Sequence, residues 1–306
     1  MSFLHVIVTR FSFRFKPTDP TDNLLSIKRL DERIAMFEKF CYSSIINQSN
    51  PNFYWIIIVD PLLPQQYIDT FNLLIQRHKS SDKYPSHGPR EIWVNQWDWQ
   101  INGLAVSTGH KLGRIEWVLE YFNCSTIDTA TAKWKYLITT RLDDDDCLVN
   151  NYINQVHSEM KKNPINGFRY LSFAVGYQHY IKQEALRKYK LPMIALGLTL
   201  ITEIKKYPMC VYLGCHTHIV GYLRDPKKHT DLYNMYLKNK EYPASKILQH
   251  KQVIDRLKII RTGEPVWVRN VHDFNLQKNI GRNLTGQKQS LNTIKEIMKT
   301  RFGVSL

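Results

Sequence analysis

Residues 137–148 read LITTRLDDDDCL, an apolar run that leads into four consecutive carboxylates and then becomes apolar again. The apolar part is typical of a buried strand, so Asp143, Asp144, Asp145 and Asp146 stand where that strand ends. Neighbouring like charges repel and raise one another's pKa unless a positive group neutralises them. The stretch therefore predicts a positive partner for the acids at the end of a buried strand.

The composition indicates a chain with a substantial core and a basic surface. It has 306 residues, of which 43% are hydrophobic, and a formal net charge of +15. This length allows one large α/β domain or two small ones. The positive charge favours an anionic partner, which can be nucleic acid, anionic lipid or a phosphorylated small molecule.

Several classes of protein are disfavoured by the sequence. No segment has the roughly 18 uninterrupted apolar residues that a bilayer-spanning helix needs. The first residues reach Arg10 and Arg14 too early for a signal peptide, so we expect a cytoplasmic protein. The five cysteines are odd in number and form no CxxC pair, which predicts buried free thiols.

Strand-like and helix-like segments alternate through the first half. Apolar runs predict strands, and helical spacing of apolar residues predicts helices, in the order strand 4–9, helix 24–48, strand 52–60, helix 64–78, strand 91–96, helix 108–122 and strand 133–142. This alternation favours an α/β fold with a mainly parallel central sheet flanked by helices. Ligands of such sheets bind at the carboxyl ends of the strands, where Arg10, Asp60 and the four acids are expected.

The second half is less regular. Residues 167–180 predict a long strand or a hairpin, and 210–222 and 265–275 predict further strands. No linker rich in proline or glycine separates the halves. We therefore expect one domain over 1–306, in which 1–150 binds a donor and 151–306 binds an acceptor and ends in an amphipathic helix.

The four acids predict a divalent metal site. Mn²⁺ and Mg²⁺ favour carboxylate oxygens and keep room for water and phosphate oxygens. On extended backbone alternate side chains face the same way, so Asp143 and Asp145 would point together. The alternative is an exposed acidic turn, because turns are rich in acids.

Three stretches resemble one known family: TTRLDDDDCL at 139–148, VIVTRFSFRF at 6–15 and PVWVRNVHDFN at 265–275. Together they are similar to the rhamnosyltransferase family, whose members look like metal-dependent glycosyltransferases of the GT-A fold. The chain departs from the family pattern after His272, where a glycine is expected and Asp273 stands. The resemblance implies transfer of a sugar, rhamnose by the family's name, from a nucleotide-diphosphate donor to a hydroxyl group on a glycan or another acceptor.

The resemblance also implies roles for particular residues. Asp143, Asp145 and His272 would hold Mn²⁺ or Mg²⁺, with His216 and His218 as alternative histidines, and Asp146 would complete or orient that site. The expected donor-binding residues are Arg10, Asp60, Lys111, Arg114, Arg141, Asp143 and Asp144. The acceptor hydroxyl needs a catalytic base if the enzyme inverts, and Asp146, Glu203, Asp273 and Glu184 are its candidates.

Two other functions are compatible with the sequence. The acids and the positive charge also fit a two-metal phosphodiesterase or nuclease, although such sites usually gather carboxylates from several elements. The basic, amphipathic segment 290–306 fits a non-catalytic module that binds nucleic acid, or a peripheral contact with an anionic membrane. The sequence contains no nucleic-acid-binding signature, and we expect no nucleic-acid partner.

Overall fold

The structure is a computed structural model, and it describes residues 2–14, 20–21, 24–97, 113–162, 165–191, 195–213, 256–272, 284–285 and 289–306. The strands within these residues are β1 (Phe3–Phe11), β2 (Tyr54–Val59), β3 (Ile92–Gln96), β4 (Tyr136–Asp143), β5 (Cys147–Leu148), β6 (Phe168–Phe173), β7 (Val175–Tyr180), β8 (Ala185–Lys190), β9 (Thr199–Glu203), β10 (Leu257–Ile260), β11 (Trp267–Val271) and β12 (Leu284–Thr285). The helices are α1 (Ile27–Met36), the π-helix η1 (Phe37–Tyr42), α2 (Ser43–Ile46), α3 (Gln65–Lys79), α5 (Glu116–Glu120), α6 (Ile127–Lys133), α7 (Tyr152–Lys162), the 3₁₀-helix η3 (Val211–Leu213) and α11 (Leu291–Phe302).

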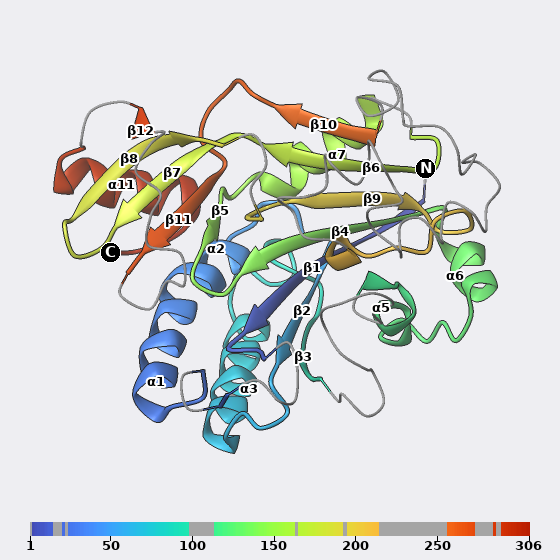
Figure 1. Cartoon of the computed structure of the whole chain (residues 1–306), viewed down its shortest axis with the longest axis horizontal. Helices are drawn as coiled ribbons and strands as arrows, with labels where there is room; N and C mark the ends of the chain where they lie inside the picture. Colours follow the sequence, from blue (N-terminus) through green and yellow to red (C-terminus); the bar gives the residue numbers. More distant parts are fainter. Residues whose placement is uncertain are drawn as a thin grey trace.

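A seven-stranded sheet runs through the middle of the molecule in the order β10-β6-β9-β4-β1-β2-β3 (Figure 1). The neighbours β4, β1, β2 and β3 are all parallel, and β9 is antiparallel to both β4 and β6. The predicted α/β fold with a mainly parallel central sheet is therefore confirmed. The carboxyl ends of β1, β2 and β4 meet at one edge, where Arg10 is in register with Asp143.

Both faces of this sheet are buried, which explains the nearly continuous apolar runs of its strands. On β1, Ile7 and Phe11 face a core shared with α1 and α3, whereas Val6 and Val8 face a core shared with α5 and α6. Figure 1 shows the two pairs of helices on opposite sides of the sheet. The four predicted strands and the helices predicted over 24–48 and 64–78 thus arise from the same apolar pattern that packs them, whereas the described part of the helix predicted over 108–122 contains only the short α5, and α6 was not predicted.

A second sheet of five strands, in the order β12-β8-β7-β11-β5, was not predicted. The segment 167–180, read from sequence as one strand or a hairpin, is divided at Ala174 between the two sheets, so that reading was wrong. Trp267 of β11 is fully buried and donates its indole N–H to the carbonyl of Phe173 at 2.7 Å. Its ring lies against Gly176 of β7, where a β-carbon would overlap the ring.

The C-terminal helix α11 packs on the body of the protein. Ile294, Met298 and Phe302 share one face and are fully buried, and the helix ends at Gly303, whose φ of 68° is left-handed. This side of α11 is therefore covered by protein, whereas Leu291 at the start of the helix is 39% exposed, so the peripheral membrane contact stays a prediction. None of the helices in the described ranges has the length and apolar character required to cross a bilayer.

Two further predictions can be compared with the structure. Cys41, Cys124, Cys147 and Cys210 are buried free thiols, as expected, and Cys215 lies outside the described residues. The segment 210–222 was predicted as a strand, but its described part forms the 3₁₀-helix η3.

Candidate active site

The four acids form a tight turn at the carboxyl end of β4. The strand ends at Asp143, and the backbone N–H of Asp146 donates to the carbonyl of Asp143 at 3.3 Å. Asp144, Asp145 and Asp146 are each only 5% exposed. The expectation that Asp143 and Asp145 point together is wrong, because it required extended backbone through residues that turn instead.

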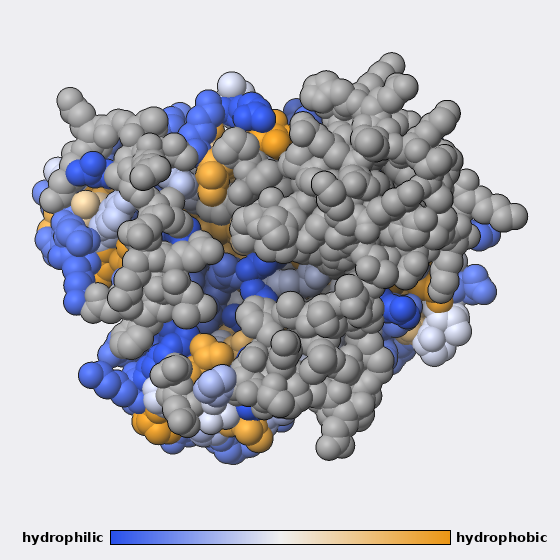
Figure 2. Space-filling model, in the orientation of Figure 1, coloured by the Kyte–Doolittle hydropathy of each residue, from blue (hydrophilic) through white to orange (hydrophobic). Residues whose placement is uncertain are grey.

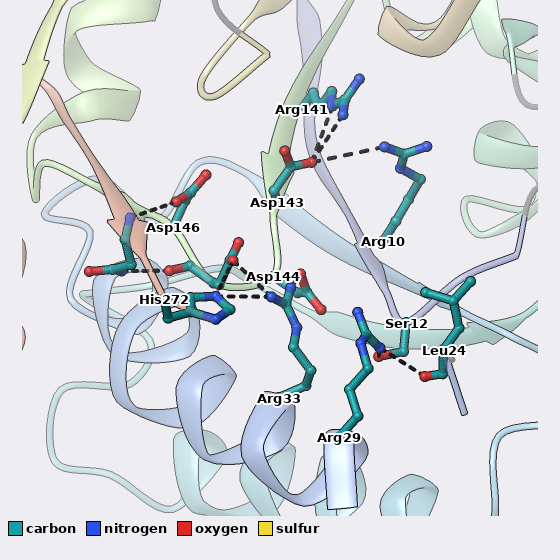
Figure 3. Close-up of polar contacts among 12 residues, drawn as sticks. Arg10, Ser12, Leu24, Arg29, Arg33, Arg141, Asp143, Asp144, Asp146 and His272 are labelled. Carbon is teal, nitrogen blue, oxygen red and sulfur yellow. Dashed lines mark hydrogen bonds and ion pairs between the residues drawn. The ribbon is translucent and has the colours of Figure 1, made fainter. Parts of the chain in front are cut away.

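Asp143 faces two arginines of the central sheet. Arg141 Nη2 lies 3.2 Å and Arg10 Nη2 lies 4.0 Å from Asp143 Oδ1 (Figure 3). Both guanidinium groups also lie over the ring of Tyr212, at 5.3 and 5.0 Å from its centre. Burial opposes ionisation of Asp143, but Arg141 and Arg10 outweigh it and hold the pKa of this carboxyl below its ordinary value.

Asp144 and Asp145 face a third arginine, which extends from α1. Arg33 pairs with Asp144 through Nη2, and its Nη1 donates to Asp145 Oδ2 at 2.8 Å. His272, just after β11, places Nε2 2.8 Å from the same Asp145 oxygen. Burial again opposes ionisation, but Arg33 and His272 lower the pKa of Asp145 well below its ordinary value. Figure 3 shows Arg33 and His272 converging on the turn.

Asn270 of β11 fixes the turn from the other sheet. Its amide donates to the carbonyl of Asp145 at 2.5 Å, and its backbone N–H donates to Asp146 Oδ1 at 3.0 Å. Its side-chain oxygen lies 2.8 Å from Nδ1 of His179. Burial, together with the charges of Asp145 and Asp143, raises the pKa of Asp146 well above its ordinary value. Asp146 thus accepts from a backbone N–H, and this bond together with the nearby charge of Arg269 offsets only part of that increase.

Arg29 brings a fourth guanidinium close to this turn. It precedes Arg33 by one turn of α1 and donates to Ser12 Oγ at 3.1 Å and to the carbonyl of Leu24 at 2.8 Å. Burial and the neighbouring charge of Arg33 lower its pKa to about 10, partly offset by Asp145. The face in Figure 2 shows hydrophilic side chains in a hollow over the carboxyl ends of β1 and β4.

Arg29, Arg33, Asn270 and Tyr212 belong to this site and were not predicted from the sequence. The spacing of four between Arg29 and Arg33 in a predicted helix does place them on one face, and this was the available signal. Nothing in the sequence indicates which way that face points. Asn270 lies within the stretch that suggested His272, but its neighbours give no reason to single it out.

The carboxylate of Asp60 is already occupied by hydrogen bonds within the protein and is not available to a sugar-nucleotide donor. It is fully buried, and its carboxylate accepts from Arg14 Nε at 2.8 Å, Arg14 Nη2 at 3.0 Å and the backbone N–H groups of Arg14 and Leu62. Its expected contact with base or ribose is corrected to a structural ion pair. This pair ties the end of β1 to the end of β2.

Glu203 lies at the wrong edge of the sheet for catalysis. It is in register with Tyr136 at the start of β4, whereas the acids follow the end of that strand. Seven residues of strand separate the two positions by about 23 Å. Glu203 instead pairs with Lys206 at 3.5 Å. The expectation that it acts as a catalytic base is therefore wrong.

The remaining predicted residues are not brought to the turn by any described contact. Arg114 is exposed and forms an isolated bridge with Met209, and Glu184 is exposed in the turn between β7 and β8. The expected donor ligand Lys111, the candidate base Asp273 and the alternative histidines His216 and His218 lie outside the described residues.

The donor set at the turn fits a hard divalent cation. Within the described part of the chain, no three Asp, Glu, His or Cys side chains converge as a metal site. Asp145 Oδ2 and His272 Nε2 nevertheless lie 2.8 Å apart, so both could face one ion. Asp144 Oδ2 is buried without a hydrogen-bond partner among the described residues. Mg²⁺ and related ions commonly take one or two protein ligands and complete their shell with water and phosphate oxygens, so this pair is chemically sufficient.

A model of one protein family matches the first part of the chain. Residues 5–93 match the family model described as "Putative rhamnosyl transferase", so the resemblance is confirmed over β1, α1, β2 and part of β3. This range includes Arg10, Arg29 and Arg33 and ends before the acidic turn. No curated protein matches the chain.

Two solved structures are similar in arrangement. One is S. aureus TarS 1–349 in complex with UDP, with a TM-score of 0.37 and 10% identity over 89% of this chain. The other is mouse xyloside xylosyltransferase 1 in its apo form, with a TM-score of 0.34 and 10% identity over 87% of this chain. The chain spans 61% of the TarS fragment and 97% of the mouse protein.

Proposed function

We propose that this protein is a glycosyltransferase of the GT-A type, which transfers a sugar from a nucleotide-diphosphate donor to a hydroxyl group of an acceptor such as a glycan. The observation that carries the proposal is the arrangement of charge at the carboxyl ends of the central strands. There an acidic turn is flanked by Arg10 and Arg141 on one side and by Arg29 and Arg33 on the other. The family match over residues 5–93 supports the same class, with rhamnose as the first sugar to test.

The arginines provide the chemistry that a diphosphate leaving group needs. Negative charge develops on the departing phosphate as the bond to the sugar breaks, and fixed positive groups stabilise it. Arg10 and Arg141 are already held in place by the ring of Tyr212 and by Asp143. Their side chains are 15% exposed, and that of Asp143 is 35% exposed, so this part of the site can reach a ligand.

Asp145 and His272 would hold Mn²⁺ or Mg²⁺, with the unpartnered oxygen of Asp144 beside them. The ion, when bound, supplies further positive charge to the diphosphate. Asn270 orients both Asp145 and Asp146 through the hydrogen bonds given above. Of the candidate bases, Asp146 is the one that lies in the turn.

The competing functions have less support. A two-metal nuclease needs a second set of carboxylates, and the described residues contain no such cluster. A membrane contact through α11 has little apolar surface to use, because Ile294, Met298 and Phe302 are buried and Leu291 is the exposed exception. We therefore expect a nucleotide-sugar donor rather than a nucleic acid or a bilayer as the main partner.

The test is a thermal-denaturation panel of UDP-, GDP- and dTDP-linked sugars, each with Mn²⁺ and with a chelator. We expect one donor to stabilise the protein, by about 2.7 kcal/mol at a hundredfold excess over its Kd. The stabilisation should disappear with chelator and in Asp145→Asn, and it should persist in Asp128→Asn, which removes an exposed charge on α6.

The comparison uses the ligand-dependent shift, so a change in basal stability of Asp145→Asn does not affect it. Stabilisation by an oligonucleotide together with no response to any sugar nucleotide would contradict the proposal and favour the phosphodiesterase.

A further inference from the structure

A positive side chain already stands where a metal ion would bind. Arg33 Nη1 lies 2.8 Å from Asp145 Oδ2 and 3.2 Å from His272 Nε2, and these two atoms lie 2.8 Å from each other. An imidazole nitrogen and a carboxylate oxygen that meet at one point are typical ligands of a divalent cation. In this structure the cation at that point is a guanidinium group.

Arg33 is held by the site rather than by the surrounding protein. The residue is only 7% exposed, and the described contacts of its guanidinium are with Asp144, Asp145 and His272. Its Nε is buried without a hydrogen-bond partner in the described part of the chain. Among the described residues, the charge of Arg33 therefore has no second anchor that would keep it in place if the acids were neutralised by another cation.

Arg33 and a bound cation would compete for the same atoms. An arginine N–H and a metal ion both take a lone pair of Asp145 Oδ2, and two positive charges at that distance repel strongly in a buried site. We propose that Arg33 is a displaceable counter-ion of the acidic turn, which sets the affinity of Asp145 and His272 for Mn²⁺. The inference deepens the proposed function, since it rests on Mn²⁺ being the cation of that site.

Displacement would also connect cation binding with anion binding. A guanidinium that leaves Asp145 needs a new negative partner, and its neighbour on α1, Arg29, lies one helical turn away on the same side. A phosphate group bound near these two arginines supplies that partner, so each ligand would favour the other. Arg33 thus offsets part of the negative charge of Asp144 and Asp145 whenever no divalent cation is bound.

The experiment is a calorimetric titration of the full chain with Mn²⁺ alone, in the absence of any nucleotide. Arg33→Gln removes the competing charge, and we expect it to bind Mn²⁺ at least about tenfold more tightly than the unmodified protein. Arg33→Lys keeps the charge but cannot hold both carboxylates at once, so its affinity should lie between the two. Arg77→Gln is the matched control, because it removes the same charge from an exposed pair with Glu38 and should leave Mn²⁺ affinity unchanged.

Arg33→Lys also provides the answer if Arg33→Gln does not fold. Unchanged or weaker Mn²⁺ binding in the folded Arg33 variants would overturn the proposal and show that Arg33 only orients the acids. Absence of Mn²⁺ binding in every variant would overturn it as well. The function proposed above is tested separately by the sugar nucleotides. If the protein binds a donor but its Mn²⁺ affinity does not depend on Arg33, the proposed function stands and the role of Arg33 as a displaceable counter-ion is refuted.

Discussion

Two buried histidines beneath the central sheet make stability depend on pH. His157 of α7 places Nε2 3.0 Å from Nδ1 of His5, whose Nε2 lies 2.9 Å from Thr140 Oγ1. The backbone N–H of Asn52 fixes the oxygen of Asn50, so the amide nitrogen of Asn50 donates to His157 Nδ1. His157 Nε2 therefore carries the proton and donates to His5, which in turn donates to Thr140. Both imidazoles are neutral in this chain of hydrogen bonds, and an added proton on His157 would face a donor.

The size of the effect follows from the shift of His157. Burial, together with the nearby charge of Lys161, lowers its pKa from 6.5 to about 4. The unfolded state therefore binds more protons below pH 6.5, so stability is complete above that pH and is lost as the pH falls towards 4. At pH 4.5 this one group costs about 2.5 kcal/mol of unfolding free energy. The pKa of His5 is lowered by burial and by His157, which adds loss in the same direction.

The assay is urea denaturation between pH 7 and pH 4.5 of the unmodified protein and of His157→Gln. The substitution loses a ring contact with Phe3 at every pH, but it should remove about 2.5 kcal/mol of the pH-dependent loss. The raised pKa of Asp146 acts in the opposite direction over this range, and it cancels in the comparison because both proteins contain it. His87→Gln, in a surface loop, is the control. Parallel profiles for the unmodified protein and His157→Gln, within about 0.5 kcal/mol, would refute the reasoning.

Two further substitutions test the fold by urea denaturation. Asp60→Asn breaks the buried pair with Arg14 and should lower the free energy of unfolding by about 3–5 kcal/mol. The control Asp69→Asn, at an exposed position on α3, should leave it almost unchanged. A loss below about 1 kcal/mol in Asp60→Asn would restore Asp60 as a candidate donor ligand. Gly176→Ala puts a methyl group into the ring of Trp267 and should cost about 1–3 kcal/mol, and an unchanged midpoint would mean that β7 and β11 can separate without loss.

The central sheet could be predicted because its strands are buried on both faces. β1, β2 and β4 are apolar runs bounded by polar residues, and the helices between them show regular apolar spacing, so element type and order follow from local pattern. The five-stranded sheet could not be predicted in this way. Ala174 carries no turn signal, yet the chain passes from one sheet to the other there. Gly176 matters only because it lies against the ring of Trp267, which is 91 residues later in the sequence.

The site was predicted where it depended on strand ends and missed where it depended on packing. Arg10, Arg141 and Asp143 are neighbours because β1 and β4 are parallel and in register, which the sequence pattern implied. Asp60 was assigned by the same reasoning, but its carboxylate is bound by Arg14. Glu203 was one of several candidate bases that spacing could not separate, and it ends the antiparallel strand β9, so it lies at the opposite edge of the sheet.

Four adjacent carboxylates, three of them buried, can stand side by side because they are divided among three environments. Asp143 is neutralised by Arg10 and Arg141 of the sheet, and Asp144 and Asp145 share Arg33 of α1. Asp146 accepts from the backbone N–H of Asn270, and the charge of Arg269 only partly offsets the effect of burial. The pKa of Asp146 is therefore raised, and this carboxyl retains its proton more readily than its neighbours do. The turn therefore carries three compensated charges rather than four equal ones. A metal ion bound at Asp145 beside Arg33 would place more positive charge there than the carboxylates can neutralise. This excess of positive charge is the physical reason that Arg33 and a metal ion should exclude each other.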